Sequence, residues 1–96
     1  MLGLLLLSNR LNISKGMEVA VLGLGYVGCP LLRRFLEKGF EAIGFDINKR
    51  LISDLSNGVC GITAFDGSIF PKCIQEGRLQ LSSDPSVLKK AKAIIL

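Results

Sequence analysis

Three glycines at positions 23, 25 and 28 follow a short apolar run in the stretch EVAVLGLGYVG at residues 18–28. Residues 19–22 have the composition of a strand that is buried on both faces, and an amphipathic helix is predicted after the glycines. In G-x-G-x-x-G spacing, Gly23 makes the tight turn out of the strand. Gly25 lets the backbone approach a pyrophosphate, and Gly28 lets the helix lie close to the sheet.

An acidic residue, Asp46, stands 18 positions beyond Gly28, at the end of a second strand-like run at residues 41–45. At this position a carboxylate accepts hydrogen bonds from the adenosine ribose of NAD and repels the 2′-phosphate of NADP. The alternative role of Asp46 is an N-cap for a helix that begins near Lys49. The strand, the glycines, the helix and Asp46 together favour an NAD site over a glycine-rich turn that serves packing alone.

Helices and strands are predicted to alternate along the rest of the chain. Helices are predicted at residues 27–38, 49–56, 70–76 and 85–91, and further strands at 79–82 and 93–96, the last of them buried. The first helix has an apolar stripe comprising Val27, Leu31, Leu32, Phe35 and Leu36. Pro30 requires that this helix begin as late as Val27 or lack one internal hydrogen bond. Residues 59–78 carry the weakest pattern.

This alternation predicts an α/β fold, a partial Rossmann-type parallel sheet of about four strands in the order 3-2-1-4, truncated after strand four. The ligand is expected over the carboxyl ends of strands one and four. The domain should occupy residues 17–96. Residues 1–16 do not match it, and we interpret them as an upstream extension, or an artefact of the assigned gene start, with no assigned function.

Composition excludes several other classes of function. The 12 basic and 8 acidic residues give a net charge of +4 without a dense basic stripe, so no nucleic acid is expected as partner. The apolar run at residues 2–7 is too short to span a bilayer and lacks the features of a signal peptide. Three cysteines with no histidine argue against a disulfide framework, a zinc site and Ser/His or Cys/His catalysis, and favour the cytoplasm. Cys29 is interpreted as a packing residue, although a thiol near a helix start can also have a low pKa.

The sequence resembles the amino-terminal segment of the UDP-glucose/GDP-mannose dehydrogenase family, most closely its UDP-N-acetylhexosamine (UDP-N-acetylglucosamine or -mannosamine) 6-dehydrogenases. The resemblance covers about residues 17–96. It rests on GLGYVG at 23–28 followed by Pro30-Leu31, GFDINKR at 44–50, Asn57-Gly58-Val59, and SSDPSVLKKA at 82–91.

The resemblance implies an NAD-dependent, two-step oxidation of the C6 alcohol of a UDP-sugar to a carboxylate, for polysaccharide precursor synthesis. It implies that Gly25, Tyr26 and Val27 lie along the pyrophosphate and that Asp46 and Arg50 contact the adenosine portion. The catalytic residues and the UDP-sugar pocket of the family lie downstream of Leu96, so no catalytic residue is assigned here and the chain alone is expected to be inactive. The family forms oligomers, which this segment does not specify.

Two other hypotheses remain at this stage. The chain could be a stand-alone NAD-binding or regulatory module without catalysis. It could also be part of another NAD-dependent dehydrogenase, such as a hydroxyacid or hydroxyacyl type, although the matches at GFDIN and SDP are then less well explained.

Overall fold

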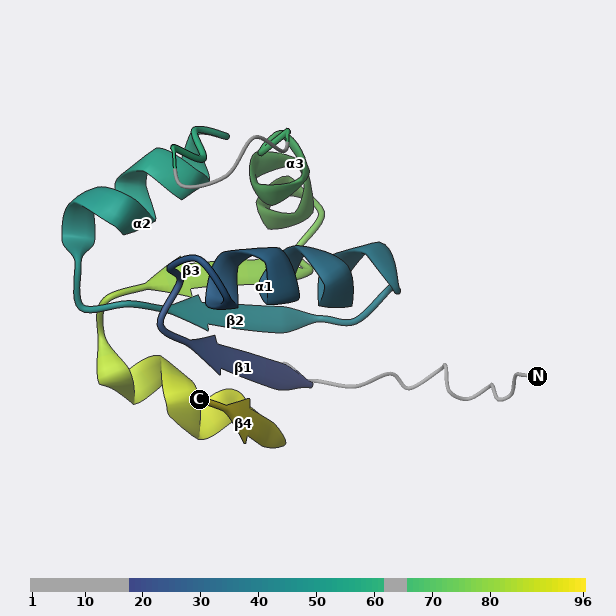
Figure 1. Ribbon diagram of the computed structural model, residues 1–96. Helices are drawn as coiled ribbons and strands as arrows, with labels where there is room; N and C mark the ends of the chain where they lie inside the picture. Colours follow the sequence, from purple (N-terminus) through teal and green to yellow (C-terminus); the bar gives the residue numbers. More distant parts are fainter. Residues whose placement is uncertain (1–17, 62–65) are drawn as a thin grey trace.

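Residues 18–61 and 66–96 are described by a computed structural model in which strands and helical segments alternate (Figure 1). The expected extension at residues 1–16 and Met17 lie outside the described residues. The elements are β1 (Val19–Leu22), α1 (Gly28–Glu37), β2 (Ala42–Phe45), α2 (Lys49–Ser56), α3 (Ile69–Gln75), β3 (Leu79–Ser82), the 3₁₀ helix η1 (Pro85–Lys90) and β4 (Ala93–Ile95).

The strands form one parallel sheet in the order β3-β2-β1-β4, which confirms the predicted topology. β1 is central, since Val19 pairs with Ala42 of β2 on one side and with Ala93 of β4 on the other. All four strands therefore point their carboxyl ends toward the same edge of the sheet. This is the edge at which open parallel sheets bind ligands, where the strand order reverses.

Helical segments cover both faces of the sheet. α1, α2 and α3 lie over one face, and η1 lies on the other (Figure 1). β1 contributes to both layers because its side chains alternate: Val19 and Val21 pack in the cluster under the three α-helices, whereas Ala20 packs with Ile43 and Val87 on the η1 side. The larger cluster is built around the fully buried side chains Leu24, Leu32, Leu36, Leu55 and Phe70.

α1 begins at Gly28, one residue later than predicted, with Val27 as its N-cap residue. Pro30 therefore lies in the first turn, where its missing N–H would have had no intrahelical partner, and no internal hydrogen bond is lost. The prediction that Val27 belongs to the buried stripe is wrong. Its side chain is 80% exposed because it precedes the helix instead of lying on its inner face.

The carboxyl-terminal segment differs from expectation in two respects. The helix after Pro85 is a 3₁₀ helix, with Asp84 accepting a hydrogen bond from the backbone N–H of Ser86 at 2.9 Å. The last strand is exposed instead of buried, with Ile94 51% exposed. β4 is an edge strand of the sheet, so only β1 pairs with it in the part of the chain that the structure describes.

Candidate dinucleotide-binding site

The turn between β1 and α1 continues the sheet before it reverses into the helix. The backbone N–H of Gly23 donates to the carbonyl of Phe45 at 2.9 Å, which extends the pairing of β1 with β2 by one residue. Gly23 then adopts a φ of 86°, in the left-handed region that side chains with a Cβ rarely occupy. The turn therefore has the backbone conformation for which a glycine at this position was predicted.

Gly28, the first residue of α1, packs directly against this turn. A Cβ on Gly28 would overlap the carbonyl oxygen of Gly23 and would lie 2.8 Å from the carbonyl carbon. The neighbouring atoms are backbone, so they cannot move aside as the end of a side chain can. The lack of a side chain at Gly28 thus sets how closely the helix approaches the strand.

Gly25 lies in a different environment. A Cβ on this residue would meet no described atom within 4 Å, and its φ lies outside the left-handed region. Neither backbone strain nor packing within the described part of the chain accounts for a glycine here. The space over Gly25 is open, next to the amino end of a ten-residue helix whose dipole and N–H groups favour an anion.

Asp46 is held against the same turn. One carboxylate oxygen, Oδ2, accepts from the backbone N–H of Leu24 at 2.8 Å, and Oδ1 accepts from the backbone N–H of Asn48 at 2.9 Å. An ionised carboxylate has about four acceptor positions, so these two bonds fix the group without saturating it. The carboxylate therefore has capacity for ribose hydroxyl groups.

The alternative assignment, in which Asp46 is the N-cap of α2, is wrong. Asn48 occupies that position, with an extended backbone and a side-chain oxygen that accepts from the N–H of Leu51 at 3.1 Å. Asp46 instead connects the end of β2 to the turn after β1. It bonds across 22 positions of sequence, a contact that a local capping role does not require.

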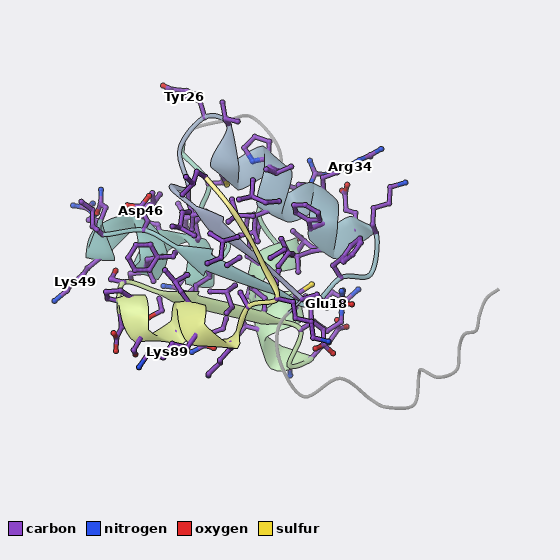
Figure 2. The ribbon with its side chains drawn as sticks, turned by 90° about the horizontal axis from the view of Figure 1, so that it is seen from below. Glu18, Tyr26, Arg34, Asp46, Lys49 and Lys89 are labelled. Carbon is purple, nitrogen blue, oxygen red and sulfur yellow. The ribbon has the colours of Figure 1, made fainter. Side chains whose placement is uncertain are left out.

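The remaining predicted residues are exposed around this turn. Tyr26 is 78% exposed, and Arg50 is exposed on the first turn of α2. Asp46 and Lys49 lie at the same end of the molecule as Tyr26, while Glu18 and Arg34 lie toward the other end (Figure 2). The structure thus brings the predicted residues to the carboxyl edge of the sheet.

One exposed apolar residue at this edge escaped sequence reasoning. Ile47 has a large apolar side chain and is nevertheless 83% exposed, between the polar residues Asp46 and Asn48. The available signal was a large apolar side chain that directly follows the strand-terminal acid, outside any helical or strand periodicity.

Cys29 lacks the features of an activated thiol, and the cysteines of the described residues belong to no metal site. Cys29 is fully buried, and burial together with the neighbouring Cys60 raises the pKa of its thiol to about 12. This favours the packing interpretation of Cys29 over an activated thiol. Among residues 18–61 and 66–96, no group of three or more candidate ligands is placed to hold a metal ion, and no helix is long and apolar enough to span a membrane.

Comparison with known proteins agrees with this geometry. The sequence profile of the UDP-glucose/GDP-mannose dehydrogenase family, NAD binding domain, matches residues 17–96. A UDP-N-acetyl-D-mannosamine dehydrogenase of Pyrococcus horikoshii is 41% identical over 46 residues, or 48% of this chain and 11% of that protein. A UDP-N-acetyl-D-glucosamine 6-dehydrogenase of Salmonella typhi is 50% identical over 42 residues, or 44% of this chain and 10% of that protein.

Among solved structures, a UDP-D-ManNAc dehydrogenase from Pyrococcus horikoshii superposes with a TM-score of 0.71 at 29% identity, over 81% of this chain and 19% of that one. The match confirms the Rossmann-like arrangement of the sheet. This chain spans between a tenth and a fifth of the length of the proteins it resembles.

Proposed function

Because this chain belongs to the UDP-glucose/GDP-mannose dehydrogenase family, we propose that it supplies the adenosine diphosphate half of an NAD site in a UDP-N-acetylhexosamine 6-dehydrogenase. The observation that carries the proposal is the contrast between Gly25 and Gly28. Gly28 is required by packing within the chain, whereas the space over Gly25 is open and next to a helix amino terminus.

In this proposal the pyrophosphate lies over Gly25, with backbone N–H groups of Tyr26 and Val27 directed toward it. Both residues are exposed at the turn, Tyr26 by 78% and Val27 by 80%. Hydrogen bonds from backbone N–H groups to phosphate oxygens are charge-assisted and stronger than those between neutral groups. The dipole of α1 adds to the attraction.

The adenosine portion would lie along the end of β2. Asp46 accepts from the ribose hydroxyls with the positions that Leu24 and Asn48 leave available. Ile47 offers an exposed apolar surface to the adenine ring, and Arg50 is an exposed residue in the first turn of α2 that would contact the adenosine portion. The negative charge of Asp46 disfavours the 2′-phosphate of NADP.

The substrate class is supported by the names of two relatives, which are UDP-N-acetylmannosamine and UDP-N-acetylglucosamine dehydrogenases. Two NAD molecules, bound in turn, would each accept one hydride in the two steps that oxidise the sugar C6 alcohol, with water, to a carboxylate. This chain binds and orients the adenosine end of the cofactor, in the cytoplasm, and contributes no catalytic residue. Purified chain that reduces NAD with UDP-N-acetylglucosamine above a blank would contradict that last assignment.

The test is a titration of the isotope-labelled chain with NAD and with NADP, followed through backbone amide shifts. Loss of a hydrogen bond to a charged acceptor costs about 1.5–3 kcal/mol, so Asp46→Ala should weaken NAD binding about tenfold to a hundredfold. NADP should be weakened far less, or bind better, because a repulsion is removed.

The ratio of the two affinities separates cofactor recognition from structural support. Asp46 also holds the N–H of Leu24, so its loss can disturb the turn, but that disturbance affects both cofactors alike. Asp54→Ala, which removes the same charge from α2, is the matched control and should leave the ratio unchanged. An unchanged NAD-to-NADP ratio in Asp46→Ala would refute the assignment, and a chain that binds neither cofactor would refute the proposed site.

A further inference from the structure

Two cysteines far apart in sequence meet beside the glycine-rich turn. Cys29 is the second residue of α1, and Cys60 lies in the segment that follows α2. Their Sγ atoms are 3.5 Å apart, a contact that spans 31 positions of sequence. Neither residue has a part in the NAD site proposed above.

The contact needs only a small movement to become a bond. A disulfide joins its sulfurs at about 2.05 Å, so the two Sγ atoms would have to approach by about 1.5 Å. Cys29 is fixed in a helix and fully buried. Cys60 is half-buried at a position that is neither helix nor strand, and it is followed by Gly61, where an added Cβ would meet no described atom within 4 Å. The approach can therefore be made by the segment that carries Cys60.

The third cysteine is engaged elsewhere. Cys73 is fully buried in α3, and its Sγ lies 3.1 Å from Nη2 of Arg78, which donates to it. Arg78 also donates to the carbonyl of Leu36 in α1 at 3.2 Å, so its guanidinium group links α1 to Cys73 of α3. Pairing is thus expected between Cys29 and Cys60 alone.

We propose that Cys29 and Cys60 are a redox-sensitive pair that forms a reversible disulfide by exchange with a small-molecule disulfide. The Cys60 thiolate attacks one sulfur of that molecule, whose S–S bond breaks and releases one thiol. The Cys29 thiol then gives up its proton and attacks the Sγ of Cys60, which releases the second thiol. The protein loses two protons and two electrons, and the small disulfide gains both as it becomes two thiols.

The order of the two steps follows from exposure. Cys60 is the half-exposed partner and meets the reagent first, whereas Cys29 is enclosed by the core. Burial also raises the pKa of Cys29, which makes it the slower, resolving thiol. The bond would tie the first turn of α1 to the segment after α2, and it does not depend on NAD binding.

Tryptic mapping tests the pairing directly, because the three cysteines fall in separate peptides, at residues 16–33, 51–72 and 73–78. The full chain is incubated with oxidised glutathione and then digested without reductant. We expect one linked product of peptides 16–33 and 51–72, lighter by two hydrogens and separated by dithiothreitol. Peptide 73–78 should stay reduced.

Variants and stability complete the test. Cys60→Ser should abolish the linked product, and Cys73→Ala should retain it, with circular dichroism to verify folding. Oxidation should raise the urea midpoint of the wild-type chain by at least about 1 M, since the bond restricts the unfolded chain. Glutathione retained on Cys60 without closure, a link through Cys73, or a disulfide between chains in place of the internal bond would overturn the proposal. The tryptic map of the wild-type chain tests the proposed disulfide even if Cys73→Ala does not fold.

Discussion

Two alanine substitutions three residues apart should have different effects. Gly25→Ala should weaken NAD binding, whereas Gly28→Ala should lower the stability of the protein. Each adds the same methyl group to the turn between β1 and α1. The structure places one methyl group in open space and the other against backbone. The pair therefore separates the glycine that a ligand requires from the glycine that the fold requires.

Gly25→Ala should leave the fold intact. A Cβ there meets nothing within 4 Å, and the backbone needs no left-handed φ. Restricting the unfolded chain can even stabilise the protein by about 0.4–1 kcal/mol. NAD binding should weaken about tenfold to a hundredfold, which corresponds to one lost charge-assisted hydrogen bond of about 1.5–3 kcal/mol when the pyrophosphate is displaced from the turn.

Gly28→Ala should destabilise the protein before any ligand is added. Its Cβ overlaps the Gly23 carbonyl, so helix and strand must separate. Such overpacking costs about 1–3 kcal/mol, and each kcal/mol lowers the melting temperature of a domain this size by about 4–8 °C.

Thermal melting followed by circular dichroism and calorimetric NAD titration below the melting temperature measure the two effects. Wild-type affinity in Gly25→Ala would show that the pyrophosphate does not pass over this residue. An unchanged melting temperature in Gly28→Ala would show that the close approach of α1 to β1 is not required.

Three further outcomes are expected. Asn48→Ala removes the cap of α2 and should lower stability by about 1 kcal/mol, measured by urea unfolding. The hydrogen bond from the Ser86 backbone N–H lowers the pKa of the Asp84 carboxyl group from its ordinary 3.8. This cap is therefore intact above pH 3.8 and is lost as the pH falls through the lowered pKa. The amide shift of Ser86 should report that loss, and an unchanged shift down to about pH 2 would contradict the assignment. The exposed edge strand β4 should let chains self-associate, and Ile94→Lys, which places a charge on it, should reduce this self-association in size-exclusion chromatography; an unchanged elution profile would exclude that edge as the contact between chains.

Much of the fold was predictable because the sequence pattern acts locally and the topology rules have few exceptions. The apolar run of β1, the tight turn at Gly23 and the helix that begins at Pro85 are all properties of neighbouring residues. Right-handed crossovers then leave few arrangements for four parallel strands. The order β3-β2-β1-β4 follows from these rules.

The sequence-based predictions were wrong or incomplete where contacts between residues far apart in the sequence determine the structure. β4 has the composition of a buried strand, but burial depends on what covers it, and Ile94 is exposed in the part of the chain described. The bond between Asp46 and Leu24, and the contact between Cys29 and Cys60, join residues 22 and 31 positions apart. Spacing in the sequence predicted Asp46 as a ligand contact and could not show that it also holds the turn.

The central place of β1 in the sheet has a consequence for the newly synthesised chain. Val19 pairs with Ala42, 23 positions later, but its other neighbour, Ala93, follows 74 positions later. At a translation rate of roughly 5–20 residues per second, the second partner emerges on the order of several seconds after the first. η1, which covers the other face of the sheet, also precedes β4 only by a few residues. The nascent protein therefore passes through a stage in which its central strand is an open edge, and the glycine-rich turn is formed beside it before the sheet is complete.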